Sequence, residues 1–229
     1  MNDTLFNNDK IILDLCGGTG SWSKPYKENG YDVRVIDLQE WLEDELCYGC
    51  GDGSGVFKKH CGCLDNGDIR LFKKPNEQIY GILSAPPCTH FSVSGAWCWE
   101  KKGKEPLLEG LSVVDACLRI VLITKPKFWV LENPVGRLKH YIGNPKCTFQ
   151  PYQYGDAYSK RTCLWGDFNM PKPTDIVEPE MVEYTTKKGE TKRMSKVNWE
   201  SFKLPKNERA RLRSMTPSGF AQAFYESNK

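Results

Sequence analysis

The chain has 229 residues, which is enough for one sizeable domain but not comfortably for two. Hydrophobic residues make up 39% and charged residues 27%, a composition that excludes a disordered or fibrous chain. The formal net charge is only +3, yet ten Lys and Arg stand against three Glu between residues 187 and 213. This local excess favours an arm that faces phosphate, although a solvated surface stretch explains it equally well.

The first ten residues are polar and lack the pattern of a signal peptide, and no apolar run reaches the length of a membrane span. We therefore expect the chain in the cytoplasm, a reducing compartment, and not in a membrane. The ten cysteines are then better explained as buried, metal-bound or catalytic thiols than as disulfides.

Short apolar stretches alternate with helical ones along most of the chain. A helix is expected before Gly30, and another over residues 107–124, where apolar residues recur every three or four positions. Residues 171–213 are charged and weakly periodic, which predicts an irregular basic segment. The predicted strands are residues 10–16, 31–37, 69–72, 79–84, 128–131 and 162–165. This alternation predicts an α/β fold with a mostly parallel sheet, helices on both faces and ligands at the carboxyl ends of the strands.

A glycine-rich turn follows the first strand, with the sequence Asp-Leu-Cys-Gly-Gly-Thr-Gly-Ser-Trp over residues 14–22. Glycines let the backbone approach a ligand, and the helix that follows offers free amides, but such turns serve several ligand classes. Asp37, at the end of the second strand, is placed to bind ribose hydroxyls. A helix cap or an exposed acid is the alternative for Asp37.

A second motif, Ser-Ala-Pro-Pro-Cys-Thr-His-Phe-Ser, occupies residues 84–92 at the end of another strand. Pro86 and Pro87 stiffen the backbone just before Cys88, as a fixed nucleophile requires. The thiolate is the reactive form, so the site must promote loss of the thiol proton. An inert core cysteine is the alternative interpretation.

A third motif, Glu-Asn-Pro-Val, begins at Glu132 after the apolar stretch 128–131. Partial burial of the Glu132 carboxyl would raise its pKa and suit it to proton donation. The alternative is that Glu132 only pairs with a neighbouring base.

Taken together and in this order, the three motifs resemble the cytosine-5 DNA methyltransferase family. Gly67-Asp68-Ile69 resembles the family's contact with the cofactor adenine, and residues 160–166 resemble its late arginine motif. Residues 214–221 are similar to the C-terminal motif of small, phage-type members. The resemblance runs from about Ile11 to the end of the chain.

The resemblance implies a single Rossmann-like domain over residues 1–229 that transfers methyl groups from S-adenosylmethionine to carbon 5 of cytosine in DNA. Cys88 would attack carbon 6 of a flipped cytosine, Glu132 would protonate or hydrogen-bond nitrogen 3, and Arg161 would hold the exocyclic oxygen. It implies a bacterial or phage-infected cell as the setting. The cofactor contacts that it implies are Asp14, Cys16, Gly18, Gly20, Trp22, Asp37, Asp68, Ile69 and Pro86.

The chain departs from the family pattern at several positions. Cys16 replaces an aromatic residue, for which Trp22 is the candidate substitute. Ala157 and Ser159 replace the first two residues of the Gln-x-Arg-x-Arg pattern, so that only Arg161 remains, with Lys160 as a source of charge. Residues 171–213 are also short for a target-recognition region. RNA, single-stranded DNA, or a catalytically silent nucleic-acid-binding subunit therefore remain alternatives to duplex DNA.

A cysteine-rich insertion is expected over residues 41–65. Its four cysteines, in two close pairs, suit a tetrahedral structural zinc site, and free surface thiols or a reversible disulfide are the alternatives. They are Cys47, Cys50, Cys61 and Cys63. Outside this insertion, Trp97 and Trp99 either close over a flipped base or pack as ordinary core residues.

Overall fold

A six-stranded sheet in the order β2-β1-β3-β4-β6-β5 forms the centre of the computed structural model, which describes residues 7–38, 67–186 and 189–229. The parallel strands are β1 (Ile11–Leu15), β2 (Asp32–Ile36), β3 (Ile79–Ser84) and β4 (Phe128–Pro134). The antiparallel strands are β6 (Thr162–Asp167), against β4, and β5 (Cys147–Phe149), against β6. The expected α/β fold with a mostly parallel sheet is confirmed.

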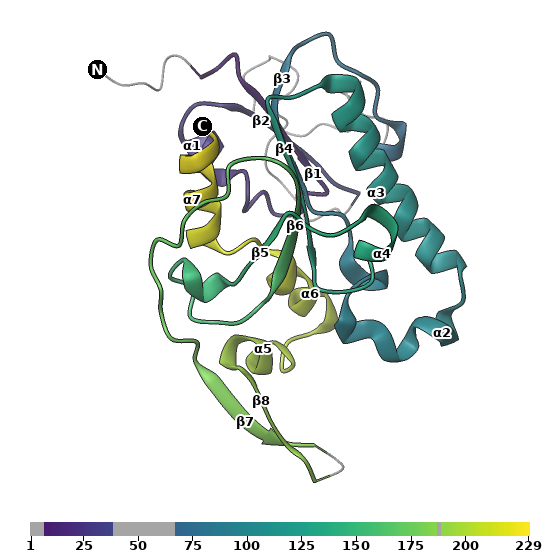
Figure 1. Ribbon diagram of the computed structural model, residues 1–229, viewed down its shortest axis with the longest axis vertical. Coiled ribbons are helices and arrows are strands. Elements are labelled where there is room, and N and C mark those ends of the chain that lie inside the picture. Colours follow the sequence, from purple (N-terminus) through teal and green to yellow (C-terminus); the bar gives the residue numbers. More distant parts are fainter. Residues whose placement is uncertain (1–6, 39–66, 187–188) are drawn as a thin grey trace.

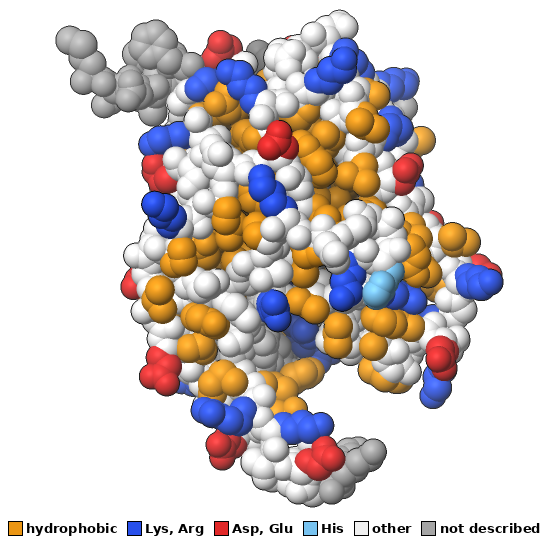
Figure 2. All heavy atoms as spheres, in the orientation of Figure 1, with side chains coloured by type: hydrophobic (Ala, Val, Ile, Leu, Met, Phe, Trp, Pro, Cys, Tyr) orange, Lys and Arg blue, Asp and Glu red, His pale blue; other side chains and the backbone are white. Residues whose placement is uncertain are grey.

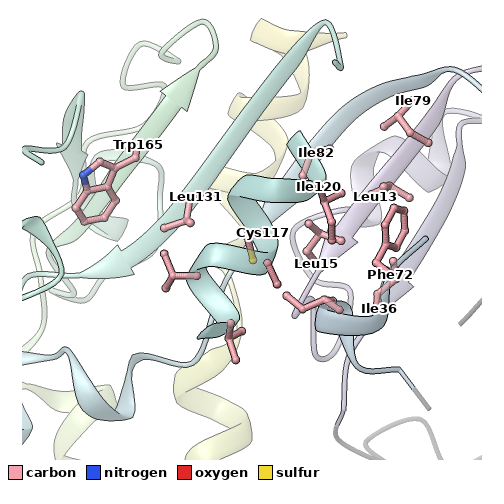
Figure 3. Packing of buried hydrophobic residues seen from close by; sticks show 14 of the residues in the cluster. Leu13, Leu15, Ile36, Phe72, Ile79, Ile82, Cys117, Ile120, Leu131 and Trp165 are labelled. Carbon is pink, nitrogen blue, oxygen red and sulfur yellow. The ribbon is translucent and has the colours of Figure 1, made fainter. Parts of the chain in front are cut away.

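Helices cover both faces of the sheet (Figure 1): α3 (Glu105–Thr124) lies on one face, and α1 (Lys24–Glu28) and α7 (Ser218–Asn228) lie on the other. Side chains alternate along a strand, so β1 sends Leu13 to the α3 face and Ile12 to the α7 face. Figure 3 shows Cys117 and Ile120 of α3 in the resulting core. This packing fixes the carboxyl ends of β1, β3 and β4 side by side.

Shorter elements connect the sheet to its surroundings. The short helices α2 (Trp99–Lys102) and α4 (Lys139–Ile142) follow β3 and β4 respectively in the chain. The 3-10 helices among the described residues are Ile69–Leu71, Cys88–His90, Val93–Cys98 and Pro151–Gln153.

The strand expected over residues 69–72 is wrong, because Ile69–Leu71 is a 3-10 helix. The carboxylate of Asp68 accepts a 2.9 Å hydrogen bond from the backbone amide of Arg70, which caps this turn. Ile69 is buried in the core that includes α3 residues. Phe72 is buried in the same core, so two of the apolar residues that suggested a strand are core contacts of a capped turn.

The irregular segment expected over residues 171–213 is also corrected by the structure. It contains the hairpin β7 (Met181–Thr185) and β8 (Thr191–Ser195), followed by α5 (Lys196–Ser201) and α6 (Lys206–Ser214). Figure 1 shows the hairpin projecting away from the main sheet. Because the hairpin buries little surface, its sequence lacks the apolar periodicity by which strands are recognised. The insertion expected over residues 41–65 lies outside the described residues.

Candidate active site at the carboxyl edge of the sheet

The glycine-rich turn after β1 bends through the left-handed backbone region at Cys16, Gly18 and Gly20, with φ values of 56°, 55° and 67°. Gly18 and Gly20 adopt this conformation without the steric cost that a side chain adds. The turn brings the Gly18 amide to 2.8 Å from Oδ2 of Asp37, to which it donates a hydrogen bond. Two of the predicted cofactor residues, Gly18 and Asp37, therefore meet at the adjacent ends of β1 and β2.

Asp14 lies fully buried beneath this turn. Ser23 Oγ donates a 2.6 Å hydrogen bond to Oδ2 of Asp14, while Oδ1 has no hydrogen-bond partner among the described residues. Burial raises the pKa of Asp14 to about 7, against the opposing hydrogen bond from Ser23 and with a further contribution from Asp37. A Cβ on Gly17 would come within 2.4 Å of the Asp14 carboxyl carbon, so glycine is required there.

The position of Trp22 does not support the expectation that it substitutes for the aromatic residue that Cys16 replaces. The Trp22 side chain is 2% exposed, and its ring lies 6.2 Å from that of Phe220 and 5.5 Å from that of Phe224. These contacts place Trp22 in the core on the α7 face. Cys16, by contrast, is half-buried at the turn itself and packs against the core on the α3 face.

Gly67 places the Asp68 segment against the end of β2. A Cβ on Gly67, whose φ is 69°, would lie 2.4 Å from the Asp37 carbonyl oxygen. The Asp68 carboxylate pairs with Arg70 at 2.7 Å, and this hydrogen-bonded pair lowers the pKa of Asp68. Ile69 is buried. The structure thus brings the Asp68 segment to Asp37, with its carboxylate held by a neighbouring guanidinium.

Cys88 begins a 3-10 helix immediately after the two prolines that follow β3. The loop is anchored on both sides. The backbone amide of Ala85 donates a 2.9 Å hydrogen bond to the carbonyl of Leu15 in β1, and the side-chain amide of Asn133 in β4 donates one of 2.9 Å to the carbonyl of Pro86. Pro86 is buried, whereas the Cys88 side chain reaches the surface. The predicted nucleophile is therefore accessible on a fixed backbone.

The surroundings of Cys88 act on its thiol in opposite directions. Neighbouring protein atoms raise the pKa of Cys88 by desolvation, and the nearby charge of Glu132 raises it further. Lys160 and Arg213 lower it. The balance keeps the thiol protonated at neutral pH, so its reactivity depends on the cations around it.

Glu132 lies in β4, opposite Leu164 of β6. Burial raises the pKa of its carboxyl, and the positive charge of Lys160 partly opposes that shift. Within the described part of the chain, no hydrogen bond or salt bridge to the Glu132 carboxylate is found. Pairing with a neighbouring base therefore does not explain why a carboxyl group lies at this position. The raised pKa suits the carboxyl to hold a proton that it can donate.

Arg161 lies just before β6, and its carbonyl oxygen accepts a 3.3 Å hydrogen bond from the amide of Val135. Its side chain is exposed. The arrangement brings the predicted catalytic residues Cys88, Glu132 and Arg161 to neighbouring strand ends of one sheet edge.

Several residues of this site were not among the predicted ones. Asn133 belongs to the Glu-Asn-Pro motif, but its partner Pro86 lies 47 residues earlier, so the sequence does not reveal the anchor. The charge of Arg213 lowers the pKa of Cys88, and the charge of Glu132 contributes to the raised pKa of Tyr158. No sequence signal identifies Arg213, because it comes from the segment expected to be irregular.

The two tryptophans that follow Cys88 differ in their surroundings. Trp99 stacks with the guanidinium of Arg137 at 4.4 Å, whereas Trp97 is 78% exposed. Packing therefore explains Trp99 but not Trp97. The face of the molecule drawn in Figure 2 is hollowed between the region of α5 and that of α2, and Lys and Arg side chains lie at the edge of the hollow.

The described residues hold no cluster of three or more His, Cys, Asp or Glu that could bind a metal ion. The predicted zinc ligands Cys47, Cys50, Cys61 and Cys63 lie outside the described residues. Among the helices that the structure does describe, none is long and apolar enough to cross a bilayer.

An α/β sheet with a glycine-rich turn after its first strand and an acid at the end of the second is the arrangement of enzymes that bind a nucleotide-containing cofactor at the carboxyl ends of the strands. Residues 12–150 match the model of the C-5 cytosine-specific DNA methylase family, and the chain belongs to this family.

Two curated relatives match part of the chain. It is 31% identical over 128 residues to the type II methyltransferase M.DdeI of Desulfomicrobium norvegicum, a match that covers 56% of this chain and 28% of that protein. It is 28% identical over 134 residues to the type II methyltransferase M.SacI of Streptomyces achromogenes, covering 58% of this chain and 23% of that protein. The matched region thus spans about a quarter of the length of these relatives.

The comparison with solved structures also matches a protein described as a DNA modification methyltransferase encoded within a prophage (E. coli). The match has a TM-score of 0.45 and 15% sequence identity, and it covers 90% of this chain and 69% of that one.

Proposed function

We propose that this chain transfers a methyl group from S-adenosylmethionine to carbon 5 of cytosine in DNA. The observation that carries the proposal is the convergence of Cys88 and Glu132 on one sheet edge, where the same cation, Lys160, acts on both. Membership of the C-5 cytosine-specific DNA methylase family supports it.

The residues at the ends of β1 and β2 fit the proposed cofactor. Asp37 offers a carboxylate to ribose hydroxyls, and the buried Oδ1 of Asp14 lacks a hydrogen-bond partner among the described residues. These acids also suit a ligand with a positive charge. When bound, S-adenosylmethionine supplies an electrophilic methyl group on a sulfonium sulfur. Gly18, Gly20, Cys16, Asp68, Ile69 and Pro86 complete the proposed set of contacts.

The remaining residues supply the nucleophile and the proton. After the thiol proton of Cys88 passes to solvent, its sulfur forms a bond to carbon 6 of the cytosine while Glu132 gives a proton to nitrogen 3, which makes carbon 5 nucleophilic. Arg161 holds the exocyclic oxygen, where negative charge develops. After methylation, the carbon 5 proton passes to solvent, which restores the ring double bond and releases the Cys88 thiolate, and the nitrogen 3 proton returns to Glu132.

A cytosine in duplex DNA must leave the base stack before Cys88 can reach it. Exposed basic residues of β8, α5 and α6 offer contacts to the phosphates, and the exposed Trp97 offers a face for stacking. We therefore propose that residues 171–213 act as a compact DNA-docking segment within a single domain.

Transfer of labelled methyl groups to cytosine-containing DNA tests the proposal directly. We expect Cys88→Ser and Cys88→Ala to abolish transfer, while Cys98→Ser, at a half-buried cysteine that ends the 3-10 helix Val93–Cys98, retains it. A duplex with 5-fluorocytosine should trap a covalent complex, because fluorine cannot leave carbon 5 as a proton. Full activity in Cys88→Ser would contradict the mechanism.

The small size of residues 171–213 supports a second candidate, the same chemistry on RNA or single-stranded DNA. Duplex DNA, its separated strands and a transfer RNA, compared as methyl acceptors at equal cytosine content, distinguish these substrates. A third candidate is a silent nucleic-acid-binding subunit, which would bind DNA without turnover at saturating cofactor.

We further propose that Cys47, Cys50, Cys61 and Cys63 bind a structural zinc ion, an interpretation that depends on their spacing alone. Metal analysis of protein purified without chelators should then find one zinc ion per chain, and a markedly lower content would contradict the site. Free thiols and a DNA substrate are consistent with action in the cytoplasm of a bacterial or phage-infected cell.

A further inference from the structure

Arg137 closes the turn that Cys88 begins. The 3-10 helix Cys88–His90 ends at carbonyl groups that find no donor within the helix, as the last carbonyls of a helix do. Nε of Arg137 donates a 2.7 Å hydrogen bond to the carbonyl of His90, and the Arg137 amide donates one of 2.9 Å to the carbonyl of Phe91. The first of these bonds is charge-assisted and therefore stronger than a bond between neutral groups.

The backbone before Arg137 makes further contacts with the Cys88 turn. The Val93 amide donates a 3.1 Å hydrogen bond to the carbonyl of Val135. A Cβ on Gly136 would collide with the carbonyl of Phe91, so the two segments lie backbone against backbone there. These contacts do not involve the Arg137 side chain. Its removal should therefore loosen the turn without detaching it from the sheet.

An aromatic ring holds the Arg137 guanidinium. The guanidinium carbon lies 4.4 Å from the centroid of the Trp99 ring, which is the distance of a cation–π contact. Trp99 is the first residue of α2, so the stack joins the segment after β4 to the segment after the Cys88 turn. Stacking restricts the rotamers of Arg137 and so keeps Nε directed at the His90 carbonyl.

Cys88 thus lies between two side-chain hydrogen bonds from the segment that carries Glu132. Asn133 donates to the carbonyl of Pro86, two residues before Cys88. Arg137 donates to the carbonyl of His90, two residues after it. One bond alone would leave the turn free to pivot, whereas a bond on each side of Cys88 limits its movement relative to β4.

We propose that Arg137, stacked on Trp99, is a positioning residue that holds Cys88 in its working place relative to Glu132. That Cys88 attacks a base rests on the proposed function, but the hold of Arg137 on the turn does not. A misplacement of a reacting group by about 1 Å can lower a rate by about 10²-fold. Loss of the Arg137 side chain should therefore slow methyl transfer more than it weakens the binding of DNA or cofactor.

Hydrogen–deuterium exchange of the protein without DNA or cofactor tests the hold directly. The amides of Phe91 and Ser92 both donate to the carbonyl of Cys88, so their exchange reports opening of the turn. We expect Arg137→Met to speed exchange in a peptide that covers residues 88–93 by about tenfold or more, with β1 unchanged. Arg137→Lys, which keeps a charged donor, should exchange more slowly than Arg137→Met. Lys101→Met, at an exposed lysine of α2, should match the unmodified protein.

Single-turnover methyl transfer at saturating duplex DNA and S-adenosylmethionine tests the consequence. We expect Arg137→Met to lower this rate by about 10- to 100-fold. Its dissociation constants for the duplex and for S-adenosylhomocysteine should stay within about twofold of those of the unmodified protein. A residue that only stabilises the fold would lower neither the rate nor the protection of the turn in protein that remains folded.

Trp99 supplies a second pair of variants in case Arg137→Met does not fold. Trp99→Leu removes the stacking face and should speed exchange of residues 88–93 by about threefold, whereas Trp99→Phe should retain most of the protection. In the double variant, the effects of Trp99→Leu and Arg137→Met should not add, because the ring acts through Arg137.

Unchanged exchange in folded Arg137→Met would overturn the inference, as would exchange in Arg137→Lys as fast as in Arg137→Met. If Arg137→Met fails to fold, unchanged exchange in Trp99→Leu would overturn it. Weaker duplex binding with an unchanged rate and unchanged exchange would make Arg137 a phosphate contact and also overturn it. Faster exchange in Arg137→Met, with no methyl transfer by the unmodified protein, would support the hold on the turn and count against the proposed function alone.

Discussion

The side-chain amide of Asn133 donates a 2.9 Å hydrogen bond to the carbonyl of Pro86. Asn133 is fully buried in β4, next to Glu132, and Pro86 lies two residues before Cys88. One hydrogen bond therefore connects the backbone of the proposed nucleophile to the strand that carries the proposed acid. Since both residues are buried, the bond fixes their separation more firmly than an exposed contact would.

Asn133→Ala should loosen the Cys88 loop and leave the Pro86 carbonyl without this partner. We expect a loss of about 1–3 kcal/mol in the free energy of unfolding and a larger loss of methyl transfer, about tenfold or more. Urea unfolding and initial methyl-transfer rates measure the two effects. Asn76→Ala, an exposed residue, is the control, and activity equal to that of the unmodified protein in Asn133→Ala would refute the anchoring role.

Glu132→Gln removes the group that we propose as proton donor. Methyl transfer should fall by about 10²–10⁴-fold. Because burial raises the pKa of Glu132, the unmodified enzyme should lose activity as rising pH removes this proton. That alkaline decline should be missing from the residual activity of Glu132→Gln, whose side chain does not titrate. Rates of single turnover across a pH series measure this, with the exposed Glu28→Gln as control.

Asp14→Asn should change how stability depends on pH. The pKa of Asp14 is about 7 in the fold, against an ordinary value of 3.8, so the folded protein holds a proton that the unfolded chain releases between those values. The free energy of unfolding therefore falls as pH rises through this window. We expect Asp14→Asn to be more stable than the unmodified protein above pH 7. The gain should be about a few kcal/mol at most, which is the limit set by the difference between the folded and unfolded pKa of Asp14.

Urea midpoints measured from pH 4 to pH 8 test this dependence. The difference between Asp14→Asn and the unmodified protein should close near pH 4, where both side chains are neutral. Asp9→Asn, at an exposed position, serves as the control. Parallel curves for Asp14→Asn and the unmodified protein would contradict a contribution of the buried carboxyl to the pH dependence of stability.

Trp97 is 78% exposed and presents a large ring to solvent. If it stacks on a base or fills the gap that a flipped cytosine leaves, Trp97→Ala should weaken duplex binding by about 5- to 100-fold. Trp97→Phe, which keeps an aromatic face, should retain most of the affinity. Fluorescence anisotropy of a labelled duplex measures both, and an unaltered Kd in Trp97→Ala would exclude a stacking role.

Arg211, on the exposed surface of α6, is a candidate phosphate contact. Arg211→Gln should weaken binding similarly for all sequences and reduce the slope of log Kd against log salt concentration by about one. Binding isotherms at several salt concentrations, with Lys74→Gln as control, measure the slope. A slope equal to that of the unmodified protein would show that Arg211 does not contact a DNA phosphate.

Local pattern predicted much of the fold. The strand at 10–16 was recognisable as a short apolar run that ends at glycines, and the strand at 31–37 has apolar residues interspersed with charged ones. The structure confirms both, and the strand at 79–84, within a residue at each end. The interpretation was wrong at residues 69–72, where the cap that Asp68 forms favours a 3-10 turn although the residues are apolar enough for a strand. It was also wrong over residues 171–213, where the strands are exposed and their sequence therefore lacks apolar periodicity.

The sequence by itself determined the chemical groups: a glycine-rich turn, a cysteine after two prolines and an acid at a strand end. These are local features, since a strand and the turn after it are consecutive in the chain. Only the tertiary structure decided that Asn133 holds Pro86, that Trp22 is buried against α7, and that the end of α6 binds Lys160. Those relationships join residues far apart in sequence, and packing of the helices on the sheet determines which of them meet.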